Sequence, residues 1–336
     1  MPSSMTPGEQ PSEPSAARVA AIVVTFNRTD DLMRCLEALD RQTRRVDRVY
    51  LIDNGDPEQT ARALETSRLS IVSRLDHIKP AANVGGAGGF CIGMERAYED
   101  GFDWLWLMDD DVVPEPSALA ELFDAHSRMP IDRKPLIVAS RVVWLDGRPL
   151  RANDPKPKRR SIARGLALDD DIKVIRLCTF ASVMIGRAAI ARYGYPFADY
   201  FTIADDTEYT YRVLKTELGV VARRSIAWHN TTPQRVFSRK PERFYFLARN
   251  YIWMMRDSDA LTRGENLWMS VLYVGALARY VISQWFAPNA LSSTARGVMD
   301  GLRRRPAPHA RAGGSHHVLT NVAASERPSR IESAIP

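Results

Sequence analysis

Short apolar runs of strand length recur along the first part of the chain. Val19 to Thr25 is a continuous apolar run, and Val49 to Ile52 and Trp104 to Met108 are further runs of this kind. Continuous runs of this length are typical of strands that are buried on both faces of a sheet. A weaker signal near Ile71 predicts one more short strand.

Segments with apolar residues at helical spacing separate these strands. Residues 31–42 place leucines on one face of a predicted helix, with Thr29 or Asp30 as its N-cap. Residues 57–66 predict a second helix, and a glycine-rich turn leads into a third helix over 88–98. Strands that alternate with helices predict an α/β fold, a Rossmann-like, mostly parallel sheet covered by helices on both faces.

Three carboxylates directly follow the predicted strand 104–108. The segment LWLMDDDVVPEP puts Asp109, Asp110 and Asp111 at the carboxyl end of that strand, where open parallel sheets bind their ligands. Such a cluster is costly unless a cation or solvent compensates it. Because alternate residues of an extended segment point the same way, Asp109 and Asp111 can share one metal ion while Asp110 faces elsewhere. A solvated acidic turn is the alternative.

A second acidic group lies further along the chain. Asp205, Asp206 and Glu208 open another predicted helix. The helix dipole favours carboxylates in a first turn, but one of them would satisfy that role and three exceed it. His229 follows a predicted strand over 220–223 and is a candidate ligand, although a lone histidine is more often structural.

The composition is that of an ordinary folded enzyme. Of the 336 residues, 45% are hydrophobic and 26% charged, which excludes a disordered or fibrous chain. The net charge of +6 is compatible with phosphate-bearing partners and does not by itself imply nucleic acid, which we do not expect as a partner. Cys35, Cys91 and Cys178 lack CxxC spacing, which argues against a zinc or disulfide framework and favours a reducing, cytoplasmic compartment.

The two ends differ from the body of the chain. Residues 1–18 lack the apolar region of a signal peptide, and residues 303–336 form a basic tail. Neither end can bury enough apolar surface to offset the cost of ordering, so we expect both to be disordered. The folded domain is then expected over 19–256, followed by a helical extension over 257–302.

Part of this extension has the composition of a membrane-interface segment. Residues 267–287 are long enough to suggest a membrane span, but Arg279 and several polar residues weaken that interpretation. Four aromatic residues of a kind favoured at membrane interfaces lie in it: Trp268, Tyr273, Tyr280 and Trp285. Arg303, Arg304 and Arg305 could contact anionic lipid. We expect an amphipathic helix on the membrane surface, and packing against the folded domain is the alternative.

The glycines of NVGGAGGF permit close approach of the backbone to a ligand at a helix N-terminus. The chain contains no GxGxxG and no GxxxxGK[ST] motif, so a nicotinamide dehydrogenase or a P-loop enzyme is a weak competitor.

The order and spacing of these segments resemble a known family. AIVVTFNR, LIDNG, NVGGAGGF, WLMDDD, ADDTEY and WHN, with RFYFLARN after them, resemble family 2 glycosyltransferases of the GT-A fold over about residues 19–256. NVGGAGGF followed by WLWLMDDD is most similar to the galactofuranosyltransferases of actinobacterial cell-wall galactan. The chain lacks the large flanking domains of the longer galactan polymerases, so processive polymerisation is not expected.

The resemblance implies a role for each candidate residue. Asp206 would be the catalytic base of a single inverting displacement, while Asp205 and Glu208 would position the acceptor sugar. The ligands of a divalent ion, Mn²⁺ or Mg²⁺, that bridges the donor diphosphate would be Asp109, Asp111 and His229. Asp53 would accept a hydrogen bond from the nucleotide base. The donor pocket as a whole would comprise Thr25, Asn27, Arg28, Asp53, Asn83, Gly85, Gly86 and Asp110.

The resulting hypothesis is an inverting, metal-dependent glycosyltransferase. It would move galactofuranose from a nucleotide-sugar donor, UDP-galactofuranose, to a polyprenyl-diphosphate-linked glycan acceptor at the cytosolic face of the membrane, where a basic loop over 154–165 could meet the acceptor diphosphate. One alternative is a rhamnosyltransferase that uses dTDP-rhamnose in polysaccharide synthesis. The other is a non-catalytic, membrane-bound scaffold with a transferase fold.

Overall fold

The computed structural model describes residues 17–150, 153–158, 169–230, 241–284 and 287–307. The strands are β1 (Val19–Thr25), β2 (Arg48–Asp53), β3 (Leu75–Ile78), β4 (Trp104–Asp109), β5 (Val112–Pro114), β6 (Ile137–Trp144), β7 (Lys156–Pro157), β8 (Ile172–Leu177), β9 (Val183–Gly186) and β10 (Gly219–His229). The α-helices are α1 (Thr29–Asp40), α2 (Pro57–Thr66), α3 (Gly85–Glu99), α4 (Ala118–Ser127), α5 (Arg187–Tyr193), α6 (Asp205–Val213), α8 (Pro241–Asp257), α9 (Arg263–Ser283) and α10 (Pro288–Arg303).

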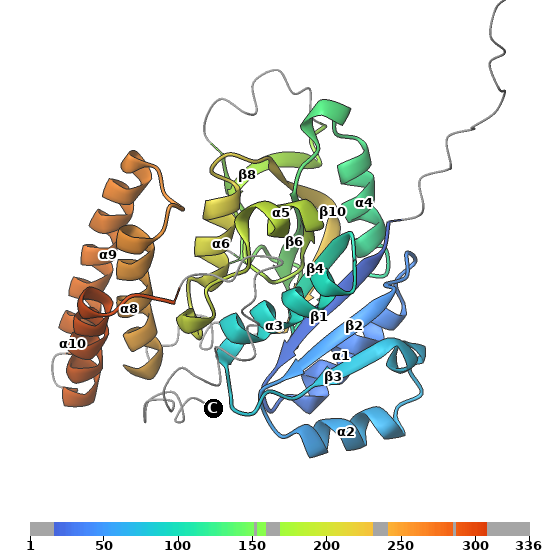
Figure 1. The fold of residues 1–336 in the computed structure, drawn as a ribbon, viewed down its shortest axis with the longest axis horizontal. Helices are drawn as coiled ribbons and strands as arrows, with labels where there is room; N and C mark the ends of the chain where they lie inside the picture. The colour runs from blue at the N-terminus through green and yellow to red at the C-terminus, as the bar shows by residue number, and fades with distance from the viewer. Residues whose placement is uncertain (1–16, 151–152, 159–168, 231–240, 285–286, 308–336) are drawn as a thin grey trace, which may run out of the picture.

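One mixed sheet forms the centre of the fold (Figure 1). Its strand order is β3-β2-β1-β4-β9-β6-β10-β8-β7, and β5 pairs with β10 beside this path. Strand β1 is parallel to β2 and β4, and β6 is parallel to β10, whereas β9 runs antiparallel between β4 and β6. Parallel pairing accounts for most of the paired residues, so the predicted α/β fold with a mostly parallel sheet is confirmed.

Alternate residues of β1 enter two separate cores. Val19, Ala21 and Val23 pack in the core under α1 and α4, while the residues between them pack in the core under α3 and α6. All seven residues of β1 are buried. Because side chains of a strand point alternately to the two faces, this burial requires helices on both sides of the sheet.

Two element boundaries differ from the prediction. Helix α1 begins at Thr29, and Arg28 holds the N-cap position without a capping hydrogen bond from its side chain, so neither Thr29 nor Asp30 caps it. Ile71 lies in a 3-10 turn over Ser70–Arg74, and β3 follows that turn. The apolar signal at Ile71 therefore reports burial in the core rather than an extended backbone.

The glycine-rich segment forms the first turns of α3 rather than a turn before it. A Cβ on Gly89 would lie 2.7 Å from a methyl group of Val24, and one on Gly93 would lie 2.4 Å from a methyl group of Ile22. The missing side chains let α3 lie directly on β1. This close packing outweighs the low helix propensity of glycine.

Three helices of the C-terminal part form a separate layer beside the sheet (Figure 1). Helices α8 and α10 approach so closely at Gly297 that a Cβ there would lie 2.5 Å from the carbonyl oxygen of Tyr245. Helix α9 contacts α8 through two buried tyrosines. The Tyr273 hydroxyl donates to the carbonyl oxygen of Ala248 at 2.9 Å, and the ring of Tyr280 stacks on an aromatic ring of α8.

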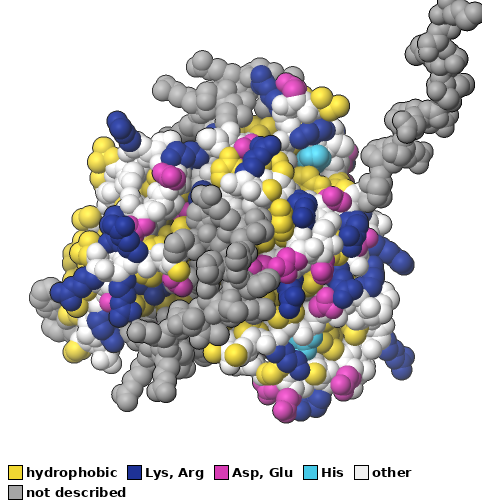
Figure 2. Space-filling model, viewed as in Figure 1, with side chains coloured by type: hydrophobic (Ala, Val, Ile, Leu, Met, Phe, Trp, Pro, Cys, Tyr) yellow, Lys and Arg dark blue, Asp and Glu magenta, His cyan; other side chains and the backbone are white. Residues whose placement is uncertain are grey.

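Helix α9 exposes several large apolar side chains on its other side. They are 45–73% exposed and comprise Leu267, Trp268, Val271, Leu272, Val274 and Ile282. Figure 2 shows apolar and basic side chains interspersed along the margin where α9 and α10 lie. Within the described ranges, no helix combines the length and the apolar character needed to cross a membrane.

Some predictions concern residues outside the described ones. These are the leader up to residue 16, most of the basic loop 154–165, Trp285, and the tail from residue 308 onward.

Candidate active site

The polar residues singled out in the sequence meet at one edge of the sheet. Strands β1 and β4 are parallel neighbours, with Val24 opposite Asp109, so the loop after β1 lies beside the acidic triplet. The chain then turns into β5, which pairs with the end of β10 and puts Val112 opposite His229. Segments far apart in sequence are thereby brought together by the strand order alone.

Asp110 faces the loop that follows β1. Its carboxylate accepts hydrogen bonds from the Thr25 hydroxyl at 2.8 Å and from the Phe26 backbone N–H at 3.3 Å. Arg28 bridges two of the acidic residues, with Nη1 3.3 Å from Asp110 and 2.6 Å from Asp111. Burial, with a further contribution from Asp111, raises the pKa of Asp110 to about 6. Thr25, Arg28 and Asp110, three of the residues proposed for the donor pocket, thus lie together.

Asp111 and His229 bind each other. Nε2 of His229 lies 3.0 Å from Asp111, and its Nδ1 lies 3.3 Å from the side-chain oxygen of Asn153. Burial alone would lower the pKa of His229, but the hydrogen bond and charge of Asp111 outweigh it and raise that pKa. Burial would likewise raise the pKa of Asp111, but His229 and Arg28 lower it. Both shifts favour a protonated His229 paired with an ionised Asp111.

Asp109 is the carboxylate of the triplet whose pKa is raised most. Burial, and then the charge of Asp111, raises the pKa of Asp109 to about 7. In the part of the chain that the structure describes, no three His, Cys, Asp or Glu side chains surround a common metal position, so Asp109, Asp111 and His229 are neighbours rather than an assembled metal centre. Two carboxylates and an imidazole are nevertheless a donor set that suits Mn²⁺ or Mg²⁺. A cation here would neutralise Asp109, so these residues fit such an ion.

Asp53 lies at the end of β2 and is buried. Its carboxylate accepts from the Gly55 backbone N–H at 2.9 Å and lies 3.1 Å from Nε2 of His77 on β3. Burial would raise the pKa of Asp53, but the hydrogen bonds from His77, Thr60 and Gly55 lower it. No sequence pattern assigned a role to His77, and its position beside Asp53 follows only from the pairing of β2 with β3.

The start of α3 is held by two asparagines. The Asn83 side chain accepts from the Gly85 N–H at 2.8 Å, and Asn54 donates to the Gly85 carbonyl at 3.1 Å. Gly85 has a φ of +69°, in the left-handed region. A Cβ on Gly86 would meet no atom within 4 Å, so the helix surface is open at that position. Asn27, also with positive φ, accepts from a backbone N–H of the loop after β2.

The second acidic group forms the first turn of α6. Burial raises the pKa of Asp205 well above its usual range, and the charges of Asp206 and Asp109 add to this effect. Burial also raises the pKa of Asp206, whose carboxylate accepts from the backbone N–H and the hydroxyl of Thr207 at 2.5 and 3.0 Å. The charge of Asp109 acts on Asp205, so the two acidic groups lie near each other.

Glu208 binds partners inside the fold. Its side chain is fully buried and accepts two hydrogen bonds from Arg212, at 2.8 and 3.0 Å, and one from the Ser258 hydroxyl at 2.6 Å. The prediction that Glu208 positions the acceptor is therefore not supported, because both of its carboxylate oxygens already accept hydrogen bonds inside the protein. The position of Glu208 in the same helix turn as Asp205 did not reveal that it binds Arg212.

Helix α8 contributes a residue that the sequence patterns did not reveal. Arg243 lies in its first turn and is electrostatically coupled to Arg28 and Asp109. Burial, followed by the charge of Arg28, lowers the pKa of Arg243, whereas Asp109 opposes this shift. RFYFLARN, which contains Arg243, belonged to the resemblance, but no local spacing distinguished this arginine from others in the segment.

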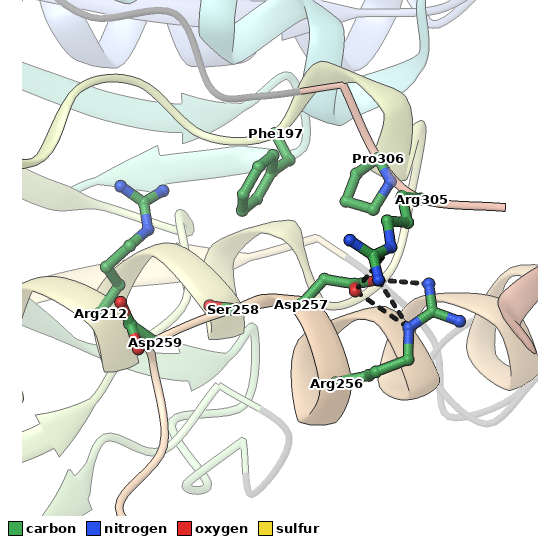
Figure 3. Close-up of a pocket in the computed structure, with 8 residues that line it drawn as sticks. All are labelled: Phe197, Arg212, Arg256, Asp257, Ser258, Asp259, Arg305 and Pro306. Atoms are coloured by element: carbon green, nitrogen blue, oxygen red, sulfur yellow. Dashed lines mark hydrogen bonds and ion pairs between the residues drawn. The ribbon is translucent and has the colours of Figure 1, made fainter.

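A cavity of about 500 Å³ lies away from the acidic sheet edge (Figure 3). It is lined by Phe197, Arg212, Arg256, Asp257, Ser258, Asp259, Arg305 and Pro306. Three of its charged groups bind one another, since Arg256 donates to Asp257 at 2.9 Å and Arg305 lies 3.6 Å from the same carboxylate. This cavity separates α6 from the segment after α10 and contains none of the predicted site residues.

Part of this chain is similar to known glycosyltransferases. Residues 20–183, just under half of the chain, match the model of the family described as glycosyl transferase family 2. The galactofuranosyltransferase GlfT1 of Mycobacterium tuberculosis (strain CDC 1551 / Oshkosh) is 40% identical over 94 residues, which cover 28% of this chain and 30% of that relative. The match thus spans less than a third of the relative's length.

Solved structures share the fold. TarS 1-349 of S. aureus, in complex with UDP, is similar with a TM-score of 0.53 at 15% identity, covering 84% of this chain and 81% of that one. The mannosyltransferase PcManGT of Pyrobaculum calidifontis, in complex with GDP-Man and Mn²⁺, is similar with a TM-score of 0.54 at 14% identity, covering 89% and 91% of the two chains. The fold is that of GT-A-like glycosyltransferases.

Proposed function

Because residues 20–183 match the glycosyl transferase family 2 model, we propose that the chain is an inverting, metal-dependent galactofuranosyltransferase. The observation that carries this proposal is the convergence of the two acidic groups. Asp109 ends β4, Asp205 and Asp206 begin α6, and burial raises the pKa of all three. The charge of Asp109 also acts on Asp205, near the carboxyl edge of the sheet, where such folds bind their ligands.

The proposed reaction needs one base and one leaving group. The oxygen of an acceptor hydroxyl attacks the anomeric carbon of the donor sugar, and the bond from that carbon to the diphosphate oxygen breaks. The nucleoside diphosphate leaves with the bonding electron pair, and Asp206 accepts the hydroxyl proton. A single displacement of this kind inverts the anomeric configuration. Asp205, next to Asp206 in the chain, is proposed to orient the acceptor sugar.

The donor is proposed to lie along β1, β2 and the start of α3. In this proposal Arg28 and the open helix surface at Gly86 receive the phosphate groups, and Asp53, beside His77, meets the nucleotide base. A bound Mn²⁺ or Mg²⁺, held by Asp109, Asp111 and His229, would stabilise the charge that develops on the leaving diphosphate. His229 must first release its proton and its contact with Asp111, which makes ion binding dependent on pH.

UDP-galactofuranose is the proposed donor because a galactofuranosyltransferase is among the similar relatives. A panel of donors tests this assignment. Purified protein is incubated with UDP-galactofuranose or dTDP-rhamnose and a synthetic polyprenyl-diphosphate disaccharide, and the products are weighed. We expect one galactofuranose to be added, in a reaction that stops in chelator and in the variant Asp206→Asn. Addition of rhamnose would support the alternative donor, and nucleotide binding without any product would support a scaffold.

The acceptor is proposed to reside at an anionic membrane surface on the cytosolic side. The exposed apolar side chains of α9 recur at helical spacing and form one stripe, and exposed arginines accompany them on α9 and α10. Basic groups beside an apolar stripe favour an interfacial position, and each contributes about 1 kcal/mol near anionic lipid.

Flotation with anionic phospholipid vesicles tests this position. Trp268→Ser combined with Leu272→Ser should release the protein from the vesicles, because both side chains are exposed on α9. Ile131→Ser is the matched control, since Ile131 is an exposed apolar residue outside α9 and should leave flotation unchanged. Flotation that survives the double substitution contradicts the interfacial role of α9.

A further inference from the structure

The segment that leads into the acidic pair of α6 has an unusual backbone. Phe201, Ile203 and Ala204 have φ values of +59°, +68° and +68°, and Asp205 follows directly. Non-glycine residues in this region cost of order 1–3 kcal/mol each and persist only where the surrounding structure holds them. Residues 199–204 must therefore be fixed by contacts from outside the segment.

Asn250 of α8 supplies the main contacts. Its side-chain amide nitrogen lies 2.9 Å from the carbonyl oxygen of Tyr200, 2.8 Å from that of Thr202 and 2.7 Å from that of Ile203. The residue is 0% exposed, so water does not compete for these carbonyl groups. One buried NH₂ group thus gathers three carbonyl groups of the segment with positive φ.

Arg249 fixes the orientation of this amide. Its Nε donates to the side-chain oxygen of Asn250 at 3.0 Å, so the nitrogen of Asn250 must point towards the segment. Arg249 also donates to the carbonyl oxygens of Asp199 and Tyr200, at 2.6 and 3.2 Å. The two adjacent residues of α8 therefore hold the whole segment from one side.

The same segment touches the proposed donor side of the site. The carbonyl oxygen of Phe201 accepts from the Ala87 N–H of α3 at 3.1 Å. A Cβ on Gly85 would lie 2.1 Å from that oxygen, so only glycine fits at the start of α3. Residues 199–204 thus link the start of α3 to the start of α6.

We propose that Asn250 is a positioning residue that sets the Asp205–Asp206 pair against the donor, and that Arg249 orients it for this task. This inference rests on the proposed function, because the position of the pair matters only if Asp206 acts on an acceptor. A purely structural asparagine would instead support α8 packing, and its loss would lower stability and activity in parallel.

Asn250→Asp in the full chain tests the proposal. Aspartate keeps the shape of the side chain but cannot donate when ionised, and it would face three carbonyl oxygens. We expect kcat with UDP-galactofuranose to fall by about 10²-fold, as for a small displacement of a reacting group, while KM for the donor and UDP binding stay unchanged. Amide hydrogen exchange over residues 199–206 should become faster.

Ile252→Ala is the matched control. Ile252 lies on α8 beside Asn250 and is also buried, but it packs on Gly301 of α10. The Ile252→Ala variant should be less stable than the unaltered chain, but it should not show the selective fall in kcat expected for Asn250→Asp. Parallel losses in both variants, or a normal kcat in Asn250→Asp, would overturn the proposal. If Asn250→Asp fails to fold, Arg249→Lys is measured in the same way, because it removes the bond that orients Asn250 while keeping the charge.

The experiment also separates this inference from the proposed function. If the unaltered chain turns over neither donor, the proposed function fails, and hydrogen exchange decides the remaining question. Faster exchange over 199–206 in Asn250→Asp but not in Ile252→Ala then supports the proposal that Asn250 holds this segment. Equal exchange in both variants overturns it.

Discussion

Replacing Glu208 with Gln should destabilise the fold without directly affecting an acceptor. Glu208 is fully buried, and the Arg212 side chain that binds it through two hydrogen bonds is only 8% exposed. Glutamine keeps the shape but leaves the buried guanidinium without its counter-charge. Breaking a buried ion pair by removing one partner costs about 3–5 kcal/mol. That is a large part of the roughly 5–15 kcal/mol by which a folded protein is stable.

Urea unfolding followed by circular dichroism measures this loss. The matched control is Glu37→Gln, because Glu37 and Arg41 form an ion pair at the same helical spacing, with both side chains exposed. Such a pair contributes about 0.3–0.5 kcal/mol, so the control should unfold almost as the unaltered chain does. The double variant Glu208→Gln with Arg212→Met removes both buried charges and should recover part of the loss.

The opposite pattern would refute this reasoning. If Glu208→Gln changed the free energy of unfolding no more than the exposed control did, yet abolished sugar transfer, the carboxylate would have to meet the acceptor. The Arg212 contact would then be incidental. The backbone carbonyls of Tyr193 and Tyr195 that Arg212 also binds would in that case be sufficient to hold it.

Three further predictions concern the sheet edge. Asp206→Asn should lower turnover by about 10² to 10⁴-fold with UDP binding retained, because the amide cannot accept the proton, and near-normal turnover would move the base to a neighbouring carboxylate. Gly89→Ala should cost about 1–3 kcal/mol in urea unfolding, because its Cβ would lie 2.7 Å from β1, whereas Gly86→Ala meets nothing within 4 Å and should weaken only UDP binding. Equal stability losses would contradict the packing role. The pKa of His229 is raised, so its pairing with Asp111 stabilises the metal-free fold below the ordinary histidine pKa of 6.5, and this contribution is lost as the pH rises through the raised value. Mn²⁺ measured by calorimetry should therefore bind more tightly with rising pH, and a pH-independent affinity would contradict the competition between proton and ion.

Much of the fold could be predicted because its signals are local. The apolar run of β1 reports burial on both faces of the sheet, and the helical spacing of α1 reports burial of one helix face. Strand β1 forms over the predicted residues, and α1 forms two residues earlier than predicted. The start of α3 could not be predicted in this way. Glycine disfavours a helix locally, and only the contact of Gly89 with β1 reveals why a helix forms there.

Only the location of the site, at the carboxyl ends of the strands, could be predicted from the sequence. The position of Asp109 after a buried strand was enough to indicate the carboxyl edge of a parallel sheet. The partner of each carboxylate could not be predicted. Glu208 and Asp206 are two residues apart on one helix, yet Glu208 binds Arg212 and Asp206 accepts from Thr207. Glu208 meets Arg212 at a helical spacing that many surface pairs share, and only its complete burial distinguishes it.

The contributions of α8 left no sequence pattern because they act through the backbone of another segment. Asn250 binds carbonyl oxygens, and every residue type carries one, so nothing in residues 199–204 announces that partner. The positive φ values of this segment are equally invisible in its sequence, since it contains no glycine at those positions. A conformation that side chains do not favour can persist only by tertiary contacts, and these contacts place Asp205 and Asp206 at the start of α6. The residues that hold the proposed base in place are therefore those that a reading of local patterns is least able to find.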